Sequence, residues 1–161
     1  MKEKETRFYN VLFPLWLLIW IPSYLWLFLI PANYIVDRFV LYFSLRLEER
    51  NAFCKKHTWK VCLMGFLADF MGSLFLFGVL LLSGENYELA NGISFDPFKD
   101  ILSFLIVVFA IIFSAFIIYL GDKKILEKAG LNKEDAKRSA LFMAILTAPY
   151  LFLFPSKFLY R

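Results

Sequence analysis

Histidine and cysteine are scarce in this sequence: one histidine and two cysteines occur among 161 residues. So few cysteines exclude a disulfide scaffold, and one histidine leaves little material for Ser-His or His-cluster catalysis. Charged residues make up 20% of the chain, whereas a soluble domain usually carries about 25%. The sequence also lacks a glycine-rich phosphate loop, a zinc-protease motif, an internal repeat and a lipidation signal. These absences exclude a soluble enzyme of any of the common types.

Apolar residues are present in excess, at 60%, with 20% aromatic residues and a mean hydropathy of +0.62. The excess is concentrated in blocks that carry almost no charge, and about 20 apolar residues match the hydrocarbon core of a bilayer. We therefore predict that residues 1–161 form one all-α domain, a polytopic integral membrane helical bundle. The apolar blocks are Val11–Ile30, Val61–Leu82, Ile101–Leu120 and Ser139–Pro155.

The number of spans depends on residues 8–47, where two apolar stretches meet at Pro31-Ala32-Asn33. One interpretation is a helical hairpin, with spans at about 11–30 and 33–47 and the turn at Pro31 and Asn33. The other is one span followed by a helix on the membrane surface. Asn33, Asp37 and Ser44 fall within a narrow arc of a helical wheel, whereas a surface helix would show a broad polar face. This pattern favours the hairpin, and hence five spans, with four as the alternative.

Local signals predict where the later helices begin and end. The span at 61–82 should end at Ser83-Gly84, and Asp96 followed by Pro97 is typical of a helix N-cap.

The following span, at 101–120, should stop at Gly121-Asp122. A short polar helix at 123–129 should then end at Gly130. Asn132 with Asp135 three residues later resembles a capping box and should open the last helix, with a span at about 139–155.

Lysine and arginine are distributed unevenly between the connections. Residues 38–60 and 123–138 carry six each, and residues 84–100 carry one. The positive-inside rule places the two basic connections in the cytoplasm. With five spans, the N-terminus is then cytoplasmic and the C-terminus external, in a plasma or inner membrane. Cys54 and Cys62 lie beside the basic stretch, so we expect reduced thiols.

Asp69 is the most informative residue, because it lies near the middle of an otherwise uncharged span. A carboxylate at that depth costs about 2.5–3.5 kcal/mol and is expected to face protein or water. It is a candidate ion or proton site, or a buried structural acid. Arg38, Ser103 and Ser114 are the first candidates for its polar partner.

Asp37 and Arg38 complete the candidate buried polar site. Either residue could reach Asp69 across the bundle, although Arg38 could equally extend to the lipid headgroups and leave Asp37 near an interface.

Small residues recur at helical spacing on three of the predicted spans, a pattern that permits close approach of helices. We expect these residues at helix contacts within one copy or between copies. They are Gly65, Ala68 and Gly72; Ala110 and Ser114; and Ala140, Ala144 and Ala148.

The stretch around His57 could in principle bind metal, since Cys54, His57 and Cys62 are all possible ligands. A zinc site needs four ligands, and no fourth is evident beside several lysines, so we expect no metal. The basic residues here are instead candidates for contact with anionic lipid headgroups. They are Arg50, Lys55, Lys56 and Lys60.

The sequence predicts a non-enzymatic membrane protein that forms or supports a transport or channel pathway. Because four or five short helices are too few to enclose a wide path, the protein would act as a homo-oligomer or as a subunit of a larger membrane complex. The alternative is a structural or regulatory membrane partner without conduction. A lipid-modifying enzyme is disfavoured by the shortage of catalytic residues. We expect no cofactor and no nucleic-acid partner, and the lipid bilayer as surroundings.

Overall fold

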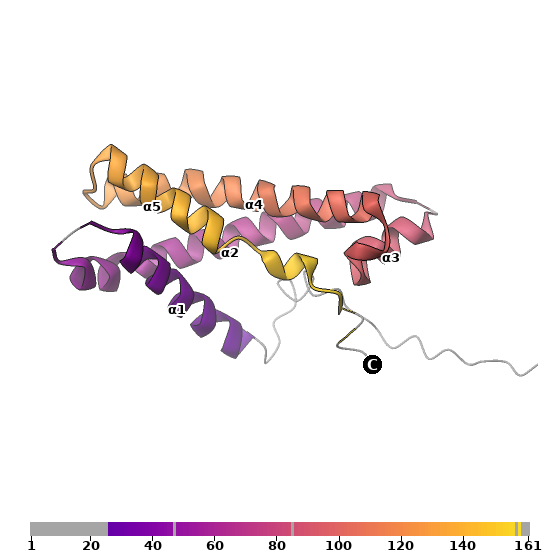
Figure 1. Ribbon diagram of the computed structural model, residues 1–161, viewed down its shortest axis with the longest axis horizontal. Coiled ribbons are helices and arrows are strands. Elements are labelled where there is room, and N and C mark those ends of the chain that lie inside the picture. The colour runs from indigo at the N-terminus through magenta and orange to yellow at the C-terminus, as the bar shows by residue number, and fades with distance from the viewer. Residues whose placement is uncertain (1–25, 47, 85, 157, 159–161) are drawn as a thin grey trace, which may run out of the picture.

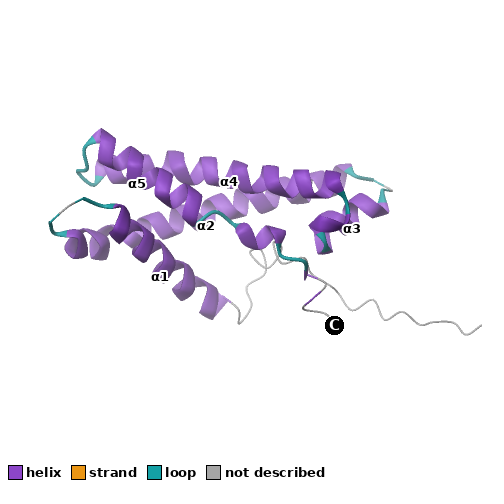
Figure 2. Ribbon diagram, in the orientation of Figure 1, coloured by secondary structure: helices purple, strands orange, loops and turns teal. Residues whose placement is uncertain are grey.

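A computed structural model describes residues 26–46, 48–84, 86–156 and 158 of the chain. Every regular element within these ranges is helical, and none is a strand (Figure 2). The all-α prediction is therefore confirmed for the described part of the chain. The elements are α1 (Trp26–Ser44), α2 (Arg50–Leu82), α3 (Tyr87–Phe95), the 3-10 helix η2 (Pro97–Lys99), α4 (Ile101–Lys128), α5 (Lys133–Leu146) and the 3-10 helix η3 (Tyr150–Leu153).

The two longest helices, α2 and α4, run side by side along the long axis of the molecule (Figure 1). α5 packs against α4, and α1 packs against both α2 and α5. The α1–α2 and α4–α5 connections lie at one end of the bundle, whereas α3 lies at the other end, where it packs on α4 (Figure 1). The described helices thus form one antiparallel bundle with its two basic connections at the same end.

Four helical segments in the described ranges are long and apolar enough to cross a membrane. They are Trp26–Ser44, Arg50–Leu82, Ile101–Lys128 and the combined segment Lys133–Leu153. Most of the predicted span at 11–30 falls outside the described residues. The choice between four and five spans therefore depends on residues before Trp26.

The predicted hairpin turn at Pro31-Ala32-Asn33 is wrong, because all three residues lie inside α1. Proline fixes φ near −65°, which a helix accepts, but it lacks the N–H that would bond to the carbonyl of Leu27, four residues earlier, and its ring crowds that carbonyl. The polar arc has the expected location: Asp37 and Ser44 are buried, and Asn33 is half-buried. The arc therefore belongs to one continuous helix and faces the bundle.

The predicted stop at Gly121-Asp122 is also wrong, since α4 continues without a break to Lys128. No separate helix forms at 123–129. Tertiary packing overrides the local signal here: Gly121 lies against the side chain of Met64 on α2, and Asp122 is fully buried. The chain turns at Gly130 instead, where φ is +99°.

The predicted cap of α5 is confirmed. The Asn132 side chain accepts a hydrogen bond from the Asp135 N–H at 2.8 Å. Asp96 is the N-cap residue of η2, with Pro97 in the first turn as predicted, but its side chain makes no capping hydrogen bond and the helix that it opens is not α4. The cap of α4 is Asp100, whose carboxylate accepts from the Ser103 N–H at 2.9 Å.

Two other boundaries differ from the predicted ones. α2 ends at Leu82 as expected, but it begins at Arg50, so the basic stretch is helical and not a loop. α5 ends at Leu146, and η3 follows after an interruption that contains Pro149. Proline disfavours a helical conformation in the residue before it, which accounts for the break within the predicted span at 139–155.

Small residues bring α2 and α4 together. Gly72 fits against the Ser114 side chain so closely that an added Cβ would lie 2.1 Å from the Ser114 hydroxyl oxygen. Ala68 and Ala110 are fully buried beside them, and the Ser114 hydroxyl donates to the Ala68 carbonyl at 3.0 Å. These four residues are called the small-residue interface below. On α5 and just beyond it, Ala140, Ala144 and Ala148 are likewise buried.

Candidate functional site

Three aspartates from three different helices are directed into the bundle. Asp37 on α1 is 5% exposed, and Asp122 on α4 is fully buried. Asp69 on α2 is half-buried, with its Oδ1 atom shielded from solvent. An acid on each of three packed helices therefore faces the interior or a cavity in it.

Contacts between α1, α2 and α4 set the level of each acid along the bundle. Asp37 accepts a hydrogen bond from the thiol of Cys62 on α2, and its Oδ2 lies 3.9 Å from the Cβ position that a side chain at Gly65 would have. Gly121, next to Asp122, packs against Met64. Asp37 and Asp122 therefore lie near the level of residues 62–65.

Asp69 lies deeper in the bundle. It follows Cys62 by seven residues, which is about 10 Å along a helix at 1.5 Å per residue. The acids are thus staggered along the axis, with two near the basic end and one towards the middle.

A cavity of about 790 Å³ opens between α1, α2 and the segment that leads from α5 into η3. Its walls are mainly apolar. Asp37, Asp69, Asn33 and Thr147 are among the polar residues that line it. An apolar cavity with a few convergent polar groups is the usual form of a small-ligand or ion-access site.

The acids are not neutralised by the basic residue that the sequence suggested. Within the described residues, both Asp122 oxygens and Oδ1 of Asp69 lack a hydrogen-bond partner. Asp69 shares its cavity with another acid, Asp37. Like charges in a low-dielectric interior repel strongly, so a proton or cation is needed to balance them.

The two serines proposed as partners of Asp69 are engaged elsewhere. Ser103 bonds to Asp100 through its hydroxyl at 3.1 Å, and Ser114 donates to the backbone of Ala68. Asp69 instead lines the cavity together with Asp37, Asn33 and Thr147. The expected pairing of Asp69 with Arg38, Ser103 or Ser114 is therefore not found.

The basic residues predicted to contact lipid lie along the first turns of α2. Lys55, Lys56 and Lys60 are exposed, and Arg50 is half-buried with its guanidinium 5.3 Å from the centre of the Tyr42 ring.

Cys54, His57 and Cys62 are all buried in this part of α2. Across the described ranges, no three His, Cys, Asp or Glu side chains are grouped closely enough to hold a metal ion.

Sequence reasoning missed Asp122 as a site residue because it interpreted Gly121-Asp122 as the end of a helix. A signal was present. Ser114, Ile118 and Asp122 are spaced four residues apart and share one buried face of α4. Extending the small-residue face of this helix by two turns would have placed Asp122 inside the bundle.

Comparison of the chain with protein-family models, with curated proteins and with solved structures finds no match in any of the three.

Proposed function

We propose that this chain is a multi-pass integral membrane protein whose interior acids are successive binding sites along a proton or small-cation pathway. The observation that carries this proposal is the staggered set of Asp37, Asp69 and Asp122, two of which line the 790 Å³ cavity. We propose further that the protein acts as an oligomer or as a subunit of a larger membrane complex.

The outer surface of the bundle supports a membrane location. Large apolar side chains point away from the core along the helices, and many are at least half exposed. Water would make such a surface costly, whereas lipid tails accept it. Examples are Leu63 and Leu67 on α2 and Phe109, Ile112 and Phe116 on α4.

The distribution of charge supports an orientation. The α1–α2 and α4–α5 connections carry the basic residues and lie at one end, which the positive-inside rule assigns to the cytoplasm (Figure 1). The segment with α3 then lies on the external side, and the described chain also ends towards that side.

The position of the acids supports transport rather than a purely structural role. A structural acid is normally satisfied by a base or by hydrogen-bond donors, yet the described residues provide no such partner for Asp122 or for Oδ1 of Asp69. Acids inside a membrane are expensive and usually mark ion or proton routes. Asp37 and Asp69 lie about 10 Å apart along the axis, so transfer between them would pass through water in the cavity that both line.

The cavity is lined by α1, α2 and the segment from α5 into η3, and residues before Trp26 lie outside the described ranges. Its remaining wall would be supplied by those residues, by a second copy or by another membrane protein. The last two are the proposed assembly.

The test is flux into liposomes that contain the purified protein and a pH-sensitive dye, under a proton gradient and under gradients of Na⁺ or K⁺. Wild-type protein should conduct, and Asp69→Asn should fold but reduce flux to the level of empty liposomes. Glu88→Gln, which removes an exposed acid on α3, is the matched control and should conduct normally.

Two results would contradict the proposal. Undiminished flux in Asp69→Asn would show that this acid does not bind the transported proton or cation. A folded wild-type protein that conducts nothing under any gradient would replace transport with the role of a structural or regulatory partner.

A further inference from the structure

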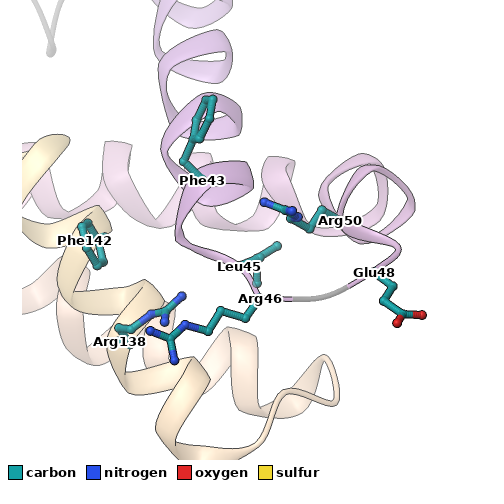
Figure 3. Close-up of a pocket in the computed structure, with 7 residues that line it drawn as sticks. All are labelled: Phe43, Leu45, Arg46, Glu48, Arg50, Arg138 and Phe142. Atoms are coloured by element: carbon teal, nitrogen blue, oxygen red, sulfur yellow. The ribbon is translucent and has the colours of Figure 1, made fainter.

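A second cavity, of about 620 Å³, lies at the basic end of the bundle (Figure 3). It is formed where the end of α1 and the start of α2 meet α5. Three of the residues that line it are arginines, namely Arg46, Arg50 and Arg138. It lies apart from the acid-lined cavity and shares no lining residue with it.

The arginines outnumber the acids in the lining of the cavity, by three to one. In Figure 3 the side chains of Arg46 and Arg138 extend towards one another, whereas the carboxylate of Glu48 points away. Glu48 is exposed and is the one acid that lines this cavity. Converging guanidinium groups repel one another, so an anion bound between them would stabilise the arrangement.

Arg138 is held in place from one side and has a donor to spare. Its Nη2 donates to the Ser44 carbonyl at the end of α1, which fixes the guanidinium between α1 and α5. Its Nε is shielded from solvent and has no hydrogen-bond partner within the described residues. A phosphate in the cavity would therefore be bound through the rest of the guanidinium, which carries its positive charge in a fixed plane.

Apolar side chains flank the arginines on the outer surface. Phe43, one residue before the end of α1, is 62% exposed, and Phe142, one turn after Arg138 on α5, is 46% exposed. The buried Leu45 also lines the cavity. The cavity therefore joins a cationic rim to an apolar flank, which matches a phosphate group that carries hydrocarbon chains.

We propose that Arg46, Arg50 and Arg138 bind the phosphate of an anionic phospholipid, whose acyl chains pass along Phe43 and Phe142. The inference that the phosphate belongs to a lipid rests on the proposed membrane location. This site is more specific than the exposed lysines of α2, because Lys55, Lys56 and Lys60 do not line the cavity.

The experiment is native mass spectrometry of the detergent-purified full chain with phosphatidylglycerol, with phosphatidylcholine and with inorganic phosphate as competitor. Arg46→Gln is the main variant, because Arg46 is exposed and its replacement leaves the core unchanged. Lys137→Gln is the matched control, since it removes an exposed charge beside Arg138 that does not line the cavity. Arg138→Gln and Arg138→Lys follow, with thermal unfolding as the check on folding.

We expect phosphatidylglycerol to bind more tightly than phosphatidylcholine. Arg46→Gln should weaken phosphatidylglycerol binding about tenfold, because a charge-assisted hydrogen bond is lost. Lys137→Gln should leave the affinity within about twofold of wild type, since an exposed charge outside the cavity contributes little.

Three results would overturn the proposal. Equal losses in Arg46→Gln and Lys137→Gln would show diffuse attraction without a site, and no loss in Arg46→Gln would show that the cavity is not used. Displacement of the lipid by inorganic phosphate at equal concentration would identify a free-phosphate site in place of a lipid site.

Discussion

Helix α2 carries two glycines on one face, seven residues apart, and their surroundings differ sharply. At Gly72 a Cβ would lie 2.1 Å from the Ser114 hydroxyl oxygen and 3.0 Å from the Phe152 ring. At Gly65 the nearest atom to a Cβ would be Oδ2 of Asp37, at 3.9 Å. Gly72 lets α2 and α4 come into contact, whereas Gly65 leaves space beside Asp37.

This difference separates a packed region from an open one. In the small-residue interface the backbones are close and the buried Ser114 hydroxyl is satisfied by Ala68. In the cavity around Gly65, the lining includes Asp37 and Asp69, and Oδ1 of Asp69 has no partner within the described residues. Packing at the interface stabilises the fold, while the cavity keeps the acids accessible to a proton or cation.

The largest effect is expected for Gly72→Ala. The new methyl group overlaps Ser114 and Phe152 and crowds the Ala110 carbonyl at 3.4 Å, so the unfolding free energy should fall by about 1–3 kcal/mol. The measurement is thermal unfolding of the purified protein in detergent.

Gly78→Ala on the same helix is the control for Gly72→Ala, because a Cβ there meets nothing within 4 Å. It should raise the unfolding free energy by about 0.5–1 kcal/mol, the usual gain from replacing a helical glycine with alanine. If both variants melt at the same temperature, the proposed tight contact between α2 and α4 is wrong.

A smaller effect, of opposite sign, is expected for Gly65→Ala. Contact at 3.9 Å from Oδ2 of Asp37 is ordinary van der Waals contact, so the helix gains about 0.5–1 kcal/mol from the lower entropy of its unfolded state. Melting temperature in detergent, compared with wild type, measures this gain. A loss of stability similar to that of Gly72→Ala would mean that the space beside Gly65 is filled.

The smallest effect concerns pH at the start of α4. Hydrogen bonds from the N–H and hydroxyl of Ser103 hold the pKa of Asp100 below its ordinary value. A lowered pKa in the folded state stabilises α4 above the unfolded pKa, near 4, and this contribution is lost as the pH falls through the folded pKa. The protection of the amides of residues 101–104 against hydrogen exchange, corrected for the intrinsic exchange rate at each pH, should therefore fall in acid.

Asp100→Asn is the comparison for the pH effect. Asparagine still caps a helix but does not titrate in this range, so exchange at residues 101–104 should lose its acid dependence after correction for the intrinsic rate. An unchanged pH dependence in Asp100→Asn would assign the effect to another group.

The sequence predicted those features of the fold that depend on neighbouring residues. The cap at Asn132, the turn at Gly130 and the end of α2 at Leu82 are encoded within a few residues of each position. The predicted turn at Pro31 and the predicted stop at Gly121-Asp122 failed for the opposite reason. Both sites contain residues that often end helices. Gly121-Asp122 stays helical because it packs against α2, whereas Pro31 is exposed and stays helical because its fixed φ is compatible with a helix.

The candidate site was predicted in part for the same reason. Asp69 stood out because its own span is otherwise uncharged, and Asp37 because of its polar arc. That these acids are near each other, and that Asp122 joins them, depends on the register between α1, α2 and α4. No local pattern in the sequence specifies how these three helices are aligned along the bundle.

Because α2 is longer than the hydrocarbon core is thick, the depth of its residues in the membrane depends on the thickness of the bilayer. Its 33 residues span about 50 Å, whereas the hydrocarbon core is about 30 Å thick. In the proposed orientation, Asp122 lies near the level where the apolar part of α2 begins, and Asp69 lies about 10 Å further in. A thicker bilayer would move its boundary past Asp122 and leave that acid within hydrocarbon depth, while a thinner one would leave it among the headgroups. The lipid chain length around the protein therefore sets which of its acids borders on water.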